Sequence, residues 1–294
     1  MYENKKYNKD FILFWWNNYL HQWFTTSDDY CRTRHKMTKN IPRILLNAIL
    51  VAHYIYIIYF VNGLKIPGHR HNAFGGQWKF LTYWNLWLQL IYFIIALCNE
   101  LIGTTTNSTK PSKLQKTRDF MFGSLAFPVG MFVSIIFWTL YLIDRKLVFP
   151  PKMDEFYPVW SNHMLHTTCL VAQLIEMIST PHDYPTRTKG MLTSMGFAMV
   201  YLGWVLVIAY KANIWVYGVL QKLPTIGRII FIGACCISFG ILFIGGEILN
   251  SKIWSSHTKA AKASKAESFE NKDNVPVPTH AYNTRSRKKV ARVD

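Results

Sequence analysis

The sequence predicts an all-α polytopic membrane protein, a helical bundle with about six transmembrane helices. Half of the 294 residues are apolar, and many of them gather in stretches close to the roughly 20 residues that one helix needs to cross a bilayer. The chain also contains 11 Trp, 16 Tyr and 19 Phe. Trp and Tyr are enriched where membrane and water meet, and a soluble domain rarely needs so many aromatic residues.

The expected spans differ in polarity. The third contains Pro128, which predicts a kink in its helix, and the fourth is the most polar of the set. Glu247 and Asn250 close the sixth span at its cytosolic end. In chain order the spans are Leu45–Val61, Leu81–Leu101, Phe120–Ile143, Trp160–Ser179, Met191–Tyr210 and Ile226–Leu249.

Two tails flank the spans, so we expect three parts. Residues 1–43 form a basic, aromatic-rich N-terminal cytosolic segment, residues 44–250 the six-span domain, and residues 251–294 a disordered basic cytosolic tail rich in Lys, Ser and Pro. Phe11–Trp16 is too short to span a membrane. It is either an interfacial amphipathic helix or a plain buried or disordered segment.

Charge sets the expected orientation and partner. The net charge is +17, but the basic residues cluster in the tails beside the spans, where anionic lipid is a better partner than nucleic acid. Cytosolic loops carry the excess of Lys and Arg, so both termini are expected in the cytosol. Residues 62–80, 144–159 and 211–225 are then lumenal or extracellular, in the endoplasmic reticulum or plasma membrane. The five cysteines show no disulfide or zinc spacing.

Polar side chains inside spans are costly and mark function by default. Helical spacing places polar residues on one face of the second span and on one face of the fourth. Both spans start at the same side of the membrane, so Thr82 and His166 are expected at similar depth. The second-span residues are Thr82, Asn85, Gln89 and Glu100, and the fourth-span residues are His163, His166 and Thr167.

A threonine beside a histidine suits attack on the ester carbonyl of an apolar substrate, because the histidine can activate the hydroxyl. Two other interpretations stay open. Membrane helices also use Thr and His only to hydrogen-bond a neighbouring helix. The pair His163 and His166 also suggests a metal site, with Glu100, Glu176 and His182 as further ligands. Glu176 lies well off the face of His166, so we expect no metal and no cofactor.

Several separated motifs are more specific. The chain resembles the family of androgen-induced protein 1 and androgen-dependent TFPI-regulating protein from about residue 43 to 255, and the motifs occur in the same order. They are Gly75–Thr82, Leu125–Gly130, Asn162–Thr168, Tyr184–Arg187 and Gly246–Asn250.

The resemblance implies a multi-pass membrane hydrolase that cleaves fatty acid esters of hydroxy fatty acids. It places the threonine nucleophile on Thr82 and the essential histidine on His166. His163, Asn85 and Gln89 are weaker candidates for orienting groups or oxyanion donors. The alternative is a non-catalytic lipid-binding regulator or small transporter, in which the same polar pocket only holds a ligand. The long N-terminal segment and the basic tail depart from the family pattern.

The predicted orientation can be tested at the one N-glycosylation sequon, Asn107-Ser-Thr109. It lies between the second and third spans, on the side expected in the cytosol. Asn107 should therefore carry no glycan when the protein is expressed in cells, as judged by its mobility before and after glycosidase treatment. A glycan on Asn107 would invert the topology or change the number of spans.

Overall fold

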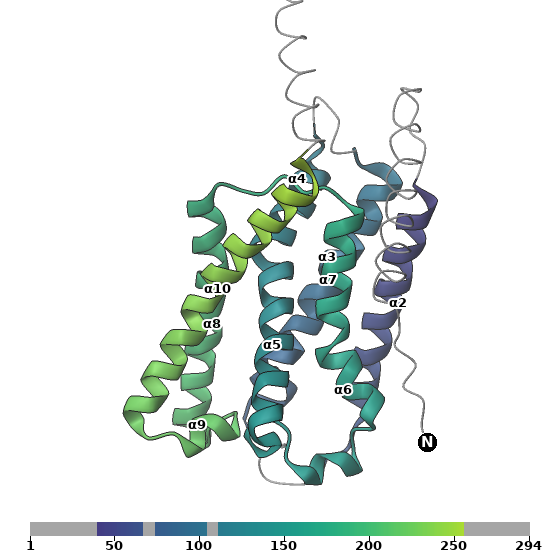
Figure 1. The fold of residues 1–294 in the computed structure, drawn as a ribbon. Coiled ribbons are helices and arrows are strands. Elements are labelled where there is room, and N and C mark those ends of the chain that lie inside the picture. The colour runs from purple at the N-terminus through teal and green to yellow at the C-terminus, as the bar shows by residue number, and fades with distance from the viewer. Residues whose placement is uncertain (1–39, 67–73, 105–110, 256–294) are drawn as a thin grey trace, which may run out of the picture. The chain divides into compact units, whose positions relative to one another are not determined.

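The computed structural model describes residues 40–66, 74–104 and 111–255, and this part of the chain consists of helices joined by loops, without a strand (Figure 1). The candidate interfacial segment Phe11–Trp16 lies outside the described residues, as does nearly all of the basic tail. The helices are α2 (Ile41–Gly63), α3 (Leu81–Ile102), α4 (Lys113–Met121), α5 (Phe127–Asp144), α6 (Val159–His166), α7 (Thr168–Ser179), α8 (Arg187–Ala212), α9 (Gly218–Lys222) and α10 (Thr225–Ile253). Short 3-10 turns are η1 (Gly76–Lys79), η3 (Arg145–Leu147) and η4 (Pro151–Glu155).

The predicted membrane helical bundle is confirmed. Within the described residues, 5 helices are long and apolar enough to cross a membrane. They are α2, α3, the joined helix Lys113–Leu147, α8 and α10. Figure 1 shows α8 and α10 side by side at one edge, with α4 at one end of the bundle and α9 at the opposite end. We call these two ends the α4 end and the α9 end.

The fourth expected span is not one continuous helix. It divides at Thr167 into α6 and the shorter apolar helix α7, which follow one another along the bundle in Figure 1. The backbone carbonyl of His163 accepts from both the Thr167 N–H, at 2.8 Å, and the Thr168 hydroxyl, at 3.3 Å. A threonine hydroxyl that bonds a carbonyl of the preceding turn competes with the helix ladder. The polar residues that made this span unusual thus also interrupt it.

The third span is reshaped ahead of Pro128. A π-helical turn, Phe122–Ala126, joins α4 to α5, and such turns are a known cause of helix kinks. The carbonyl of Ala126 accepts a hydrogen bond from Gln89 Nε2 at 2.9 Å. Gly130 lies on the same side of the helix, where an added Cβ would come within 2.8 Å of that nitrogen. The glycine therefore lets α5 approach α3 closely.

Charged side chains gather at the α4 end. Arg118 Nη2 lies 2.7 Å from Asp119 Oδ1, and Arg118 Nη1 lies 3.8 Å from Glu100 of α3. Burial lowers the pKa of His182, so its ring meets Asp119 uncharged across 3.0 Å, with Nδ1 donating to the carboxylate. Tyr92 donates to Glu176 of α7 at 2.9 Å. This buried cluster ties α3, α4 and α7 to the segment before α8.

Arg118→Met should destabilise the protein by about 3–5 kcal/mol, because removing one partner of a buried ion pair leaves uncompensated charge behind. The matched control is Arg187→Met, which breaks a more exposed pair with Glu247 at 2.8 Å and should cost at most about 1 kcal/mol. Thermal unfolding in detergent measures both variants. Equal shifts in the two midpoints would contradict a stabilising role for the buried cluster.

Candidate functional site

A cavity of about 340 Å³ opens inside the bundle near the α9 end. Its walls come from the start of α3, the middle and end of α5, α6, α8, α9 and α10, with the segment 146–157 closing one side. Most of the lining side chains are apolar, including Phe132, Leu140, Val205, Phe231 and Phe239. A cavity of this kind suits a ligand with long apolar chains and few polar groups.

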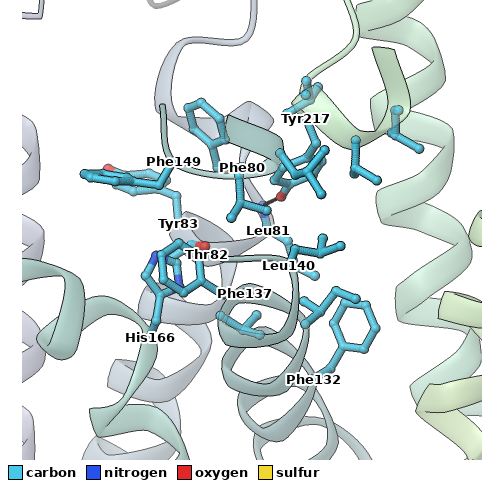
Figure 2. Close-up of a pocket in the computed structure, with 18 of the residues that line it drawn as sticks. Phe80, Leu81, Thr82, Tyr83, Phe132, Phe137, Leu140, Phe149, His166 and Tyr217 are labelled. Carbon is cyan, nitrogen blue, oxygen red and sulfur yellow. Dashed lines mark hydrogen bonds between the residues drawn. The ribbon is translucent and has the colours of Figure 1, made fainter. Parts of the chain in front are cut away.

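Thr82 and His166 both line this cavity. Thr82 is the second residue of α3 and His166 is the last residue of α6. Figure 2 shows both among the residues that line the cavity, with Phe137 against the histidine. Both belong to the described part of the chain, and no hydrogen bond joins them there. Catalytic hydrogen bonds are often long in a free enzyme and tighten when substrate binds.

Two contacts fix the position of His166. Its ring stacks on Phe137 with centroids 3.5 Å apart and planes 2° apart. Because the helix breaks at Thr167, the backbone carbonyl of His166 can accept a hydrogen bond from the Ser134 hydroxyl of α5. The side chain is 7% exposed, and Nδ1 is buried without a hydrogen-bond partner. Since Nδ1 is sealed, Nε2 is the ring nitrogen that can meet a ligand in the cavity.

The start of α3 is held by two tyrosines. Tyr217, before α9, accepts from the Leu81 N–H at 2.9 Å. Tyr201 of α8 donates to the Lys79 carbonyl at 2.8 Å and lies 2.9 Å from the Tyr217 hydroxyl. Burial raises the pKa of Tyr217, so it remains a neutral phenol. These bonds fix the backbone immediately before Thr82 and leave its hydroxyl on the cavity wall.

The three weaker candidates do not reach the cavity. Gln89 Nε2 donates to Asn85 Oδ1 at 2.9 Å, and Gln89 Oε1 accepts from Gln173 of α7. These amides therefore belong to a buried network between helices. His163 is exposed, stacks on Trp138 and bonds the Thr167 hydroxyl at 3.1 Å. Its ring lies outside the cavity that His166 lines.

The arrangement of the described residues does not support the metal interpretation. Among the described residues, no group of three or more His, Cys, Asp and Glu side chains is arranged to hold an ion. His163 is exposed while His166 lines the cavity, so the two imidazoles do not converge. Glu100 is engaged instead at the α4 end, where it faces Arg43 at 3.6 Å and Arg118.

The structure adds polar residues that the sequence analysis did not single out. Asn162 lines the cavity one helical turn before His166 and is 8% exposed. Tyr157 lies at the segment that closes the cavity, and burial raises its pKa to about 12. The sequence did contain a signal for Asn162, because it lies four residues before His166 and so on the same helix face.

Comparison with known proteins identifies the family. The model of the FAR-17a/AIG1-like proteins matches residues 42–251. The chain belongs to the FAR-17a/AIG1-like family. The human androgen-induced gene 1 protein is 35% identical over 223 residues, 74% of this chain and 93% of the relative. The androgen-dependent TFPI-regulating protein of Mesocricetus auratus is 32% identical over 208 residues, 70% of this chain and 90% of the relative.

More distant similarity extends to fungi. A UPF0641 membrane protein of Schizosaccharomyces pombe is 22% identical over 202 residues, 68% of this chain and 86% of the relative. No solved structure matches the chain. The region matched by the FAR-17a/AIG1-like model holds the bundle from α2 into α10, with Thr82 and His166, and leaves out both tails. The resemblance seen in the motifs is therefore confirmed as family membership.

Proposed function

We propose that this FAR-17a/AIG1-like protein is a membrane hydrolase that cleaves fatty acid esters of hydroxy fatty acids, with Thr82 as nucleophile and His166 as base. The observation that carries the proposal is the placement of these two side chains on the wall of one largely apolar cavity. They come from α3 and from α6, 84 positions apart by number (166 − 82). The motifs that resemble the family independently point to the same two residues.

The cavity supports a two-step ester hydrolysis. The Thr82 hydroxyl attacks the ester carbonyl carbon while His166 takes its proton, and His166 returns that proton to the alkoxide that leaves. A hydroxy fatty acid departs and the acyl group stays on Thr82. Water then attacks the acyl-threonine with His166 as base, and the fatty acid is released with the hydroxyl of Thr82 restored.

The apolar part of the cavity suits the chains of such a substrate. From Thr82 and His166 the lining continues to α8 and α10, where it includes Leu202 and Ile232. Burying a methylene group stabilises a complex by about 0.8 kcal/mol, so long chains supply most of the binding energy. In the orientation predicted from charge, with both termini cytosolic, the α9 end and the cavity lie toward the lumenal or extracellular leaflet.

One observation favours a second candidate function. No carboxylate is bonded to the ring of His166 in the described part of the chain, and Nδ1 lacks a partner. A histidine base usually has a third group to orient it. A non-catalytic regulator or small transporter needs only the cavity. Hydrolysis of a fatty acid ester of a hydroxy fatty acid by purified protein, with inert Thr82→Ala as the blank, separates the two functions.

Covalent labelling tests the nucleophile. An electrophilic phosphonate should modify Thr82 and no other residue, because only an activated hydroxyl attacks it at an appreciable rate. Mass spectrometry of the labelled peptide gives the site. Thr82→Ala should abolish labelling and hydrolysis, whereas Thr82→Ser keeps a hydroxyl and should retain some of both. Labelling that persists in Thr82→Ala would move the nucleophile elsewhere, with Thr167 and Thr168 the next to examine.

A pair of histidine variants separates a base from a metal ligand. His166→Ala should lower the hydrolysis rate by about 10²–10⁴-fold, the usual loss when acid–base catalysis is removed, with expression unchanged. His163→Ala should cost much less, because its exposed ring lies outside the cavity. Equal losses in both variants, together with inactivation by a chelator that added metal reverses, would refute the threonine–histidine mechanism.

A further inference from the structure

Asn162 carries an amide that makes no side-chain hydrogen bond to the described residues. The residue lines the cavity and is 8% exposed, Oδ1 is buried without a hydrogen-bond partner, and the donor Nδ2 makes no hydrogen bond to a described residue either. Asn162 and His166 are four residues apart in α6, so they share a helix face. The amide therefore borders the same space as the ring of His166.

Two other buried amides in the bundle, those of Asn250 and Gln89, are engaged at both their oxygen and their nitrogen. Asn250 accepts from the His182 N–H at 3.3 Å and donates to the His182 carbonyl at 2.9 Å. Gln89 both donates and accepts within its network. Buried polar groups are almost always paired, because an unmade buried hydrogen bond destabilises the folded protein. An unpaired amide that faces a cavity is thus available to a polar group of the ligand.

We propose that Asn162 is the oxyanion donor of the proposed hydrolase, with Nδ2 donating to the carbonyl oxygen of the bound ester. This inference rests on the proposed function. When the bond from Thr82 Oγ to the carbonyl carbon forms, the π pair of the C=O moves to oxygen, and the Asn162 N–H stabilises the negative charge that develops. When the intermediate collapses, that pair returns and the bond to the leaving oxygen breaks.

Chemistry favours an amide for this task. The amide of Asn162 is neutral, so it enters the apolar cavity without the desolvation cost of a charged donor. A preorganised donor needs no reorganisation when charge develops on the substrate. His166, on the same helix face, transfers the proton, and Asn162 stabilises the oxyanion.

Asn162→Leu keeps the size of the side chain and removes its polar atoms. Loss of one oxyanion donor costs about 10²–10³-fold in kcat, so we expect that loss with little change in KM. The thermal midpoint should stay the same or rise, because the variant also removes an unpaired buried amide. Asn162→Ala also lacks the donor and should lose kcat likewise, which covers the case in which the Leu variant fails to fold.

The matched control is Asn47→Leu. Asn47, on α2, is also buried, at 1% exposure, and its Oδ1 also lacks a partner, but it does not line the cavity. The same chemical change at Asn47 should leave kcat and KM unaltered. Comparing Asn162→Leu with Asn47→Leu therefore separates the effect of losing an amide in the cavity from the effect of losing any buried amide.

Steady-state hydrolysis of a defined fatty acid ester of a hydroxy fatty acid, with phosphonate labelling in parallel, decides the matter. An inactive, unlabelled wild-type protein would refute the proposed hydrolase and the Asn162 role with it. An active wild type with unchanged kcat in Asn162→Leu or Asn162→Ala would overturn the Asn162 role alone. A rise in KM at constant kcat would also overturn it, since that pattern marks ground-state binding.

Discussion

The interruption of one membrane helix at Thr167 is the feature on which the rest of the site depends. Inside a bilayer each backbone polar group must find its partner within the protein. The break frees the carbonyl of His166 from the helix ladder, and Ser134 of α5 satisfies it. The same contact draws α6 against α5, where Phe137 meets the imidazole face to face. In a continuous helix that carbonyl would already accept from the backbone N–H four residues on, so Ser134 would no longer be its main partner.

The two ends of the bundle differ in their buried polar residues. At the α4 end, Arg118, Asp119 and Glu176 are buried near one another and join helices that are distant in sequence. Toward the α9 end, the cavity lining holds neutral polar residues such as Asn162, Tyr201 and Tyr217 together with Lys146, and Lys79 is buried three residues before Thr82. The carboxylates of the α4 end therefore lie away from the cavity. The cavity lining of the described residues is largely apolar and contains no Asp or Glu.

The sequence predicted the bundle well because hydrophobic length is a local property that composition records directly. Five spans appear as long apolar helices. It also predicted that Thr82 and His166 share one region, because depth follows from position along a span. The direction in which each side chain points around its helix axis was harder to predict. Residues three apart, such as His163 and His166, differ by about 60° around a helix, and that difference leaves one ring outside the cavity. Asn85 and Gln89 satisfy the same periodicity, but Gln173 of α7 engages them in a network whose partners no local pattern reveals.

The unpartnered Nδ1 of His166 bears on how the proposed reaction balances charge. In hydrolases with a third acidic residue, a carboxylate stabilises the imidazolium that forms as the nucleophile loses its proton. Here the described residues supply no such carboxylate to the ring. The imidazolium and the oxyanion would then form together in a low-dielectric cavity, where opposite charges at close range attract strongly. The developing oxyanion itself would be the main counter-charge of His166, and a neutral donor such as Asn162 would stabilise it without competing for that attraction.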